Sequence, residues 1–83
     1  MKNDRMRNKY FLRIGDDTLE SARPYRTKAA ALAAFADVAA DLWRYGQRVT
    51  ASIHMAPSLD DVVEYPDLVL NLGPRGGVRV EHT

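Results

Sequence analysis

The chain has no cysteine among its 83 residues. Disulfide bonds, thiolate zinc sites and cysteine nucleophiles are therefore excluded. No apolar run approaches the roughly 20 residues that a membrane-spanning helix needs. The amino terminus, MKNDRMRNKY, is basic but is not followed by the apolar stretch of a signal peptide. These absences predict a cytoplasmic protein without a membrane contact.

A strong excess of charge is also missing, because the formal net charge is +1. No overall field therefore favours nucleic acid or a membrane surface as the partner. The charge is unevenly distributed, however. Residues 1–28 carry eight Lys or Arg against four acids, which gives +4, and residues 29–83 carry four Arg against seven acids, which gives −3. This asymmetry keeps a basic amino-terminal arm under consideration.

The length of 83 residues and the hydrophobic content of 46% indicate one folded domain. Residues 1–8 are polar and lack periodicity, so we expect a flexible basic arm there and a single α+β domain over 9–83. YFLRI, residues 10–14, predicts a strand. After a turn cluster at Gly15, the weaker segment 18–22 is expected to return as a second strand, which makes 9–22 a hairpin.

Residues 28–45 are the clearest helix. They are rich in alanine, and Thr27 is placed to cap the first turn while Gly46 is placed to end the last one. Apolar side chains recur at spacings of three and four and should form the buried side, namely Leu32, Phe35, Val38 or Ala39, and Leu42.

Three further strands are expected after the helix, over 48–55, 67–72 and 78–81. In 48–55 the alternation directs Ile53 to one face and Ser52 and His54 to the other. The connection 56–66 contains Ser58 followed by Asp61, a pattern that favours a helical turn within 59–64.

The resulting order, ββαβββ, predicts an α+β fold. It is a two-layer sandwich in which an antiparallel sheet of four or five strands packs on the amphipathic helix 28–45. The opposite face of the sheet is expected to be polar and open. Sequence alone does not give the order of the strands in the sheet.

The sequence GPRGG, residues 73–77, lies between two alternating segments, which is typical of a hairpin loop. A phosphate-binding loop would need a following helix and a Lys-Ser or Lys-Thr pair, and neither is present. A single RGG is also far short of repeated RNA-binding segments. The loop should turn the chain, and it can also present Arg75 to a partner.

Residues with potential chemistry are few. His54 and His82 would need Glu81 or another carboxylate to hold zinc, and the simpler interpretation is two surface histidines. The acids of 60–64 lack the spacing and glycine of a calcium loop and are better read as a solvated turn. Ser52 and His54 share a strand face, but no nucleophile motif surrounds them. We therefore expect no enzyme, no metal and no cofactor.

Binding is the remaining class of function. Trp43 and Tyr45 close the helix, where they serve either as the edge of the core or as aromatic anchors for a partner. The residues that we expect to bind a partner protein are Phe11, Arg13, Trp43, His54 and Arg75. The leading hypothesis is a non-enzymatic protein, monomer or homodimer, that docks on a larger protein or ribonucleoprotein complex. Its sharpest form is a phage or mobile-element inhibitor of a host defence complex, acting like an anti-CRISPR protein, and it depends on the small size of the chain rather than on a motif.

The alternative hypothesis is direct nucleic-acid binding. An aromatic side chain beside arginines on an open sheet face can stack bases. Phe11 would supply the aromatic, and the basic side chains would be Arg5, Arg7, Lys9 and Arg13. No RNP motif, helix-turn-helix or KH loop accompanies them, and the other interpretation of the arm is a solvated tail.

Overall fold

The computed structural model describes residues 8–15, 18–73 and 75–82. Five strands and one α-helix occur in it, with two short 3₁₀ helices in the connections. The strands are β1 (Lys9–Ile14), β2 (Arg23–Tyr25), β3 (Ala51–Ala56), β4 (Leu68–Leu72) and β5 (Val78–His82), the helix is α2 (Lys28–Arg44), and the 3₁₀ helices are η1 (Leu19–Ser21) and η2 (Leu59–Asp61).

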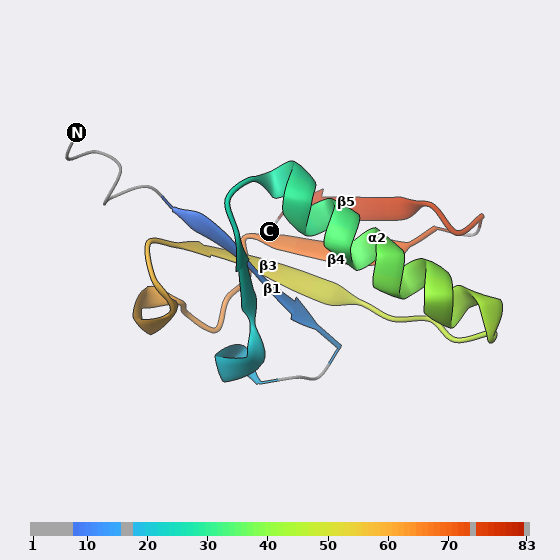
Figure 1. The fold of residues 1–83 in the computed structure, drawn as a ribbon, viewed down its shortest axis with the longest axis horizontal. Helices are drawn as coiled ribbons and strands as arrows, with labels where there is room; N and C mark the ends of the chain where they lie inside the picture. Colours follow the sequence, from blue (N-terminus) through green and yellow to red (C-terminus); the bar gives the residue numbers. More distant parts are fainter. Residues whose placement is uncertain (1–7, 16–17, 74, 83) are drawn as a thin grey trace.

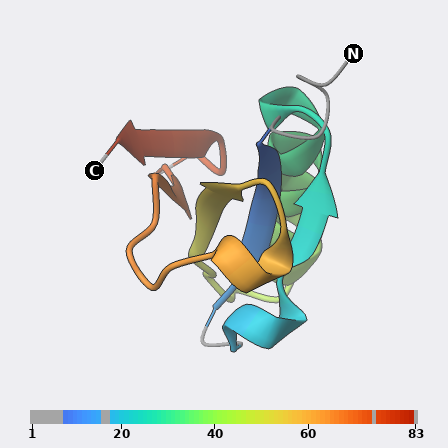
Figure 2. The ribbon, with the colours of Figure 1, turned by 90° about the vertical axis from the view of Figure 1, so that its left-hand side faces the viewer.

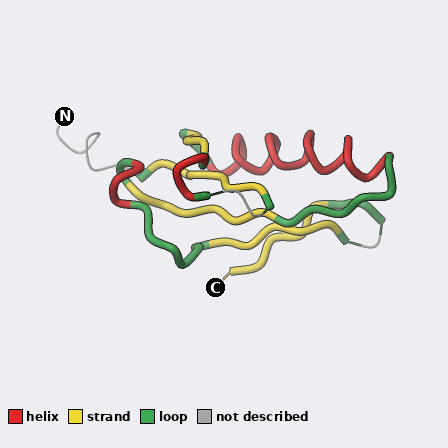
Figure 3. Tube along the Cα trace, turned by 90° about the horizontal axis from the view of Figure 1, so that it is seen from below, coloured by secondary structure: helices red, strands yellow, loops and turns green. Residues whose placement is uncertain are grey.

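All five strands form one antiparallel sheet in the order β2-β1-β3-β4-β5. Helix α2 lies across one face of it, so that the molecule has two layers (Figures 1 and 3). The predicted fold class is therefore confirmed. The strand order also shows that β1 and β3 are neighbours at the centre of the sheet. Their paired positions are at least 37 residues apart in sequence, the smallest separation being that of Ile14 and Ala51.

Helix α2 has both predicted ends. The Thr27 hydroxyl accepts a hydrogen bond from the backbone N–H of Ala30 at 3.1 Å. At the other end Gly46 has φ 75°, and the N–H groups of Gly46 and Gln47 donate to the carbonyls of Trp43 and Leu42. This pair of bonds is a Schellman motif, which needs the left-handed conformation that glycine adopts without strain.

The main core lies between α2 and the sheet. The fully buried helix residues are Ala31, Phe35 and Ala39, spaced four apart, and Phe35 packs with the buried side chains of β1, β3 and β4. The predicted stripe was correct for Phe35 and for the Ala39 alternative. Leu32 is only half-buried and Val38 is exposed. Small alanines at the contact line let the helix approach the sheet closely, which turns the larger neighbours toward the edges of the interface.

The predicted hairpin over 9–22 was wrong in its second strand. Residues 19–21 form η1, and the strand that pairs with β1 comes later, at β2, with Phe11 opposite Pro24. Proline is tolerated there because β2 is an edge strand and needs no N–H on its outer side. The helical turn expected in 59–64 is limited to η2, where Ser58 bonds the Asp61 carboxylate rather than capping the backbone.

The loop between β4 and β5 turns the chain as predicted. Gly73 donates its N–H to the carbonyl of Gly77 at 2.7 Å, and Gly76 donates to the carbonyl of Gly73 at 3.0 Å. Gly76 has φ 84°, a conformation in which a side chain would be strained. Pro74 lies outside the described residues.

Candidate docking surface

The five residues predicted to bind a partner separate into two groups. Phe11, Arg13 and His54 share the sheet face that points away from α2, with Phe11 directly opposite His54 across β1 and β3. Trp43 is at the carboxyl end of α2, and Arg75 is in the β4–β5 loop. Figure 1 shows these last two segments together at one end of the molecule.

The first group is not an open surface. Phe11 is 3% exposed and His54 is 1% exposed. Phe11 belongs to a second, smaller core with Ala22, which follows η1, Ala56 at the end of β3, and Val62, which follows η2. The expectation of an open polar face was therefore wrong over β1 and β3. The loop 57–66 folds back over these strands, and the local alternation of β3 carries no signal for that long-range contact.

A chain of polar contacts links the side chains under this cover. The guanidinium of Arg13 donates through Nε to Ser52 Oγ at 3.3 Å, and Ser52 Oγ lies 2.9 Å from His54 Nε2. His54 Nδ1 is 2.8 Å from the carbonyl oxygen of Val63. Arg13 also forms an ion pair with Glu64, at 3.2 Å between Nη1 and Oε2.

This network satisfies the polar groups that it buries. A carbonyl only accepts, so Nδ1 of His54 carries a proton, and in the neutral ring Nε2 accepts from the Ser52 hydroxyl. No buried side-chain nitrogen or oxygen of the described residues lacks a partner. The arrangement resembles a serine–histidine pair only in its distance, because both side chains are buried and the histidine is oriented by a peptide carbonyl that lies under the η2 segment. Its evident effect is to fasten the loop 57–66 to the sheet.

The second group has a different environment. Trp43 is 36% exposed, and two other segments of the chain contact its ring. The Arg48 guanidinium lies over the ring, with Cζ 5.3 Å from the ring centroid, within the range of a cation–π contact. A Cβ built on Gly76 would lie 3.5 Å from Trp43 Cε2, so the backbone of the β4–β5 loop is against the indole. Trp43, Gly46 and Arg48 line a shallow hollow of about 230 Å³.

Exposed groups surround this ring. Tyr45, at the C-cap of the helix, is 79% exposed, and Arg44, Arg48 and Arg75 are exposed as well. Arg44 is paired with Asp41 at 3.2 Å, an exposed contact worth little to stability. Arg48 and Arg75 form no ion pair within the described part of the chain, which gives this end a positive surplus. The set Trp43, Tyr45, Arg48, Arg75 and Gly76 is the basic aromatic end.

Two of these residues could not be assigned from the sequence. Arg48 is in a segment that we expected to be strand, and nothing near it indicates that its side chain meets Trp43. Gly76 was interpreted as a turn residue only. Both contacts depend on the packing of the β4–β5 loop against the helix terminus, which the sequence does not reveal.

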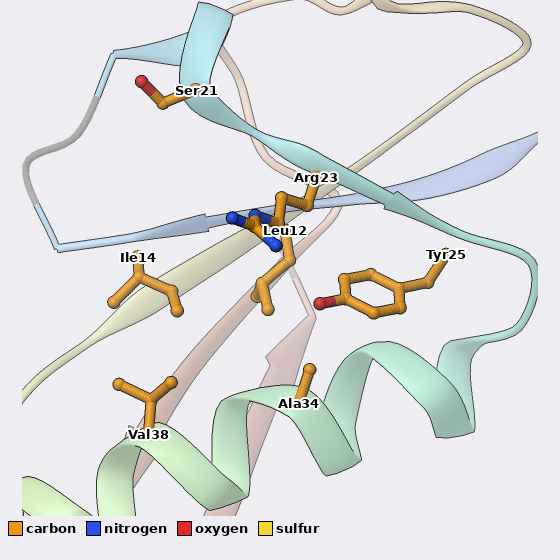
Figure 4. A pocket seen from close by; sticks show the side chains of 7 residues that line it. All are labelled: Leu12, Ile14, Ser21, Arg23, Tyr25, Ala34 and Val38. Atoms are coloured by element: carbon orange, nitrogen blue, oxygen red, sulfur yellow. The ribbon is translucent and has the colours of Figure 1, made fainter.

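A separate cleft lies between α2 and the edge formed by β1 and β2 (Figure 4). It has a volume of about 290 Å³ and is lined by Leu12, Ile14, Ser21, Arg23, Tyr25, Ala34 and Val38. Its floor is apolar, and Figure 4 shows the Tyr25 hydroxyl pointing into it. This volume is at the lower limit for small-molecule sites. None of the lining residues is a nucleophile with a base beside it.

Metal ligands are not brought together in the described residues, where no group of three or more His, Cys, Asp or Glu could hold an ion. His54 is buried on β3 and His82 is exposed on β5, and β4 lies between these two strands. Within 8–15, 18–73 and 75–82 no helix has both the length and the apolar character that a bilayer crossing requires.

Comparison of the chain with family models, with curated proteins and with solved structures gives no match. The function is therefore argued from the geometry of the surface alone.

Proposed function

We propose that this protein is a non-enzymatic binding module of the cytoplasm that docks on a larger protein complex through its basic aromatic end. One observation carries the proposal. The Trp43 ring is contacted by Arg48 and by the β4–β5 loop and remains one-third exposed, near an exposed tyrosine and two arginines that form no ion pair with the described residues. Tryptophan, tyrosine and arginine are the residues that most often dominate the binding energy of protein interfaces.

Pre-organisation strengthens this interpretation. Trp43 is on the last turn of a capped helix, and the loop opposite it is closed by two backbone hydrogen bonds. An aromatic anchor that is already ordered loses little conformational entropy on binding, which raises affinity for a given contact area. The partner surface that this chemistry fits is acidic, with an apolar depression for the ring edge.

The nucleic-acid alternative loses its stacking residue in this structure. Phe11 is buried, and Arg13 is engaged with Ser52 and Glu64. Lys9 is exposed, but Arg5 and Arg7 lie outside the described residues. At the basic aromatic end Gly76 and Arg48 already contact the indole, which disfavours the insertion of a base there. A protein partner is therefore the better-supported proposal.

The experiment is affinity capture from host-cell lysate, with and without nuclease. The test variants are Trp43→Ala and Arg75→Glu, the second of which changes an exposed loop residue and leaves the core intact. Tyr65→Ala is the matched control, because Tyr65 is an aromatic residue, 85% exposed, in the segment at the other end of the molecule (Figure 1).

The proposal predicts a defined protein that survives nuclease, is captured by the wild type and by Tyr65→Ala, and is lost with both test variants. Capture of nucleic acid alone, abolished by nuclease and by high salt, would support the alternative. The narrower hypothesis, inhibition of a host defence complex, predicts in addition that the captured protein belongs to such a complex and that its activity falls when this chain is added.

A further inference from the structure

The two edges of the sheet differ in what they offer to another strand. Hydrogen bonds in an antiparallel ladder alternate, so each strand residue directs its backbone groups either to one neighbour or to the other. Gly15 donates to Thr50 across β1 and β3, and Gly73 donates to Gly77 across β4 and β5. Together with the registers of the strand pairs, these two hydrogen bonds determine which neighbouring strand the backbone groups of each residue face.

At the β2 edge the alternation directs Arg23 and Tyr25 toward β1 and leaves Pro24 facing outward. Proline has no N–H to donate, so this three-residue edge is closed to further pairing. At the β5 edge the alternation directs Arg79 and Glu81 toward β4. Val78, Val80 and His82 therefore present their N–H and C=O groups outward. Within the described residues, no turn, loop or side-chain hydrogen bond occupies those groups.

The side chains of β5 also distinguish among possible registers. Arg79 and Glu81 project on the face away from α2, and neither forms an ion pair within the described part of the chain. Glu81 accepts only a hydrogen bond from the neutral amide of Asn71, at 3.3 Å. In an antiparallel pair of two β5 strands centred on Val80, Arg79 of each copy is opposite Glu81 of the other.

We propose that β5 pairs antiparallel with β5 of a second copy of this chain, about a twofold axis at Val80. The backbone pattern and the charge pattern select the same register. Val80 faces outward, so it forms a hydrogen-bonded pair with its counterpart, and Val78 pairs with His82 of the other copy. Arg79 and Glu81 then fall in the non-hydrogen-bonded positions, where opposing side chains are closest. A parallel arrangement would bring like charges together.

The product is a continuous sheet of ten strands, twice the five of one chain. Val78 and Val80 are half-buried at the margin of the main core. On the α2 side Val80 would meet its counterpart, and Val78 would meet His82 of the other copy. Figure 2 shows β5 at the margin opposite to the helix and β2, with the edge directed away from both. The paired residues, Val78–His82, do not include any residue of the basic aromatic end, so dimer formation and docking can be tested with different variants.

A charge-exchange experiment tests the register. Arg79→Glu makes the strand acidic at both positions and Glu81→Arg makes it basic at both, so each variant repels its own copy. Sedimentation equilibrium should show a wild-type dimer and, for each variant alone, a dissociation constant raised about tenfold or more. Equimolar mixing of the two variants restores opposite charges at every pair and should give a heterodimer with near wild-type affinity. The double variant should dimerise again.

Val80→Pro is a second test, because it removes an outward N–H without touching the β4 ladder, and it should give a monomer whose circular dichroism is unchanged. A wild type that stays monomeric to millimolar concentration would overturn the proposal. A dimer that is indifferent to both charge reversals, or variants that fail to associate when mixed, would overturn it as well.

Discussion

Ser52 Oγ and His54 Nε2 lie 2.9 Å apart beneath the segment that carries η2, and the far nitrogen of the same ring is 2.8 Å from the Val63 carbonyl. The imidazole thus joins the central strand to a loop nine residues further along the chain. This arrangement converts a polar strand face into part of the interior. It makes the position of the loop depend on one buried and one part-buried hydrogen bond.

Ser52→Ala should lower the free energy of unfolding by about 1–3 kcal/mol, because it leaves His54 Nε2 buried without a partner and also removes the acceptor of Arg13 Nε. Urea denaturation followed by circular dichroism measures the change. Ser58→Ala is the control, since that hydroxyl bonds an exposed carboxylate, and its effect should stay within about 0.5 kcal/mol. A neutral Ser52→Ala would show that the network contributes nothing to stability.

The same pair should be chemically inert. A buried serine whose histidine is held under a folded loop offers no path for an electrophile, so we expect no labelling of Ser52 by a fluorophosphonate probe under native conditions. Mass spectrometry of the treated protein checks this. Stoichiometric modification of Ser52 would contradict the non-enzymatic proposal.

Phe35→Ala should destabilise the fold by about 3–5 kcal/mol, because Phe35 is fully buried at the contact between α2 and the sheet and its loss leaves a cavity. Val38→Ala, on the same helix but exposed, is the matched control and should change stability by less than about 1 kcal/mol. Thermal unfolding of the two variants separates them. Equal effects would mean that the helix does not face the sheet as described.

Gly46→Ala should cost about 1–2 kcal/mol, since its φ of 75° is the left-handed conformation that disfavours any Cβ. Gly77→Ala provides the control, because that glycine does not have positive φ and a Cβ there would meet no atom within 4 Å. Chemical denaturation of both variants gives the comparison. An unchanged stability of Gly46→Ala together with a lowered stability of Gly77→Ala would contradict the backbone conformations assigned to these two glycines.

The sequence was sufficient for the elements whose signals are local. The capped alanine-rich helix, the period-two strands after it and the glycine turn before β5 all follow from patterns within a few residues. The second strand was misplaced because residues 18–22 lack alternation and because proline at an edge resembles a break. Phe11 packs with Ala22 and Val62, and His54 bonds the Val63 carbonyl, all of which lie outside β1 and β3, so no local pattern of these strands could show the cover.

Three of the five residues of the basic aromatic end, Trp43, Tyr45 and Arg75, were predictable from the sequence. Trp43 and Arg75 were singled out by residue type and position, and the structure brings the helix end and the loop together. Arg48 and Gly76 complete the surface through contacts across the fold, which only the packing of the loop on the helix reveals.

Site-specific photo-crosslinking tests docking at the basic aromatic end most directly. Tyr45 and Tyr65 are 79% and 85% exposed, so either can be replaced by benzoylphenylalanine without disturbing the core. Irradiation in host cells should give one discrete protein adduct from position 45 and none from position 65. An adduct from position 65 alone, or none from position 45, would contradict the account.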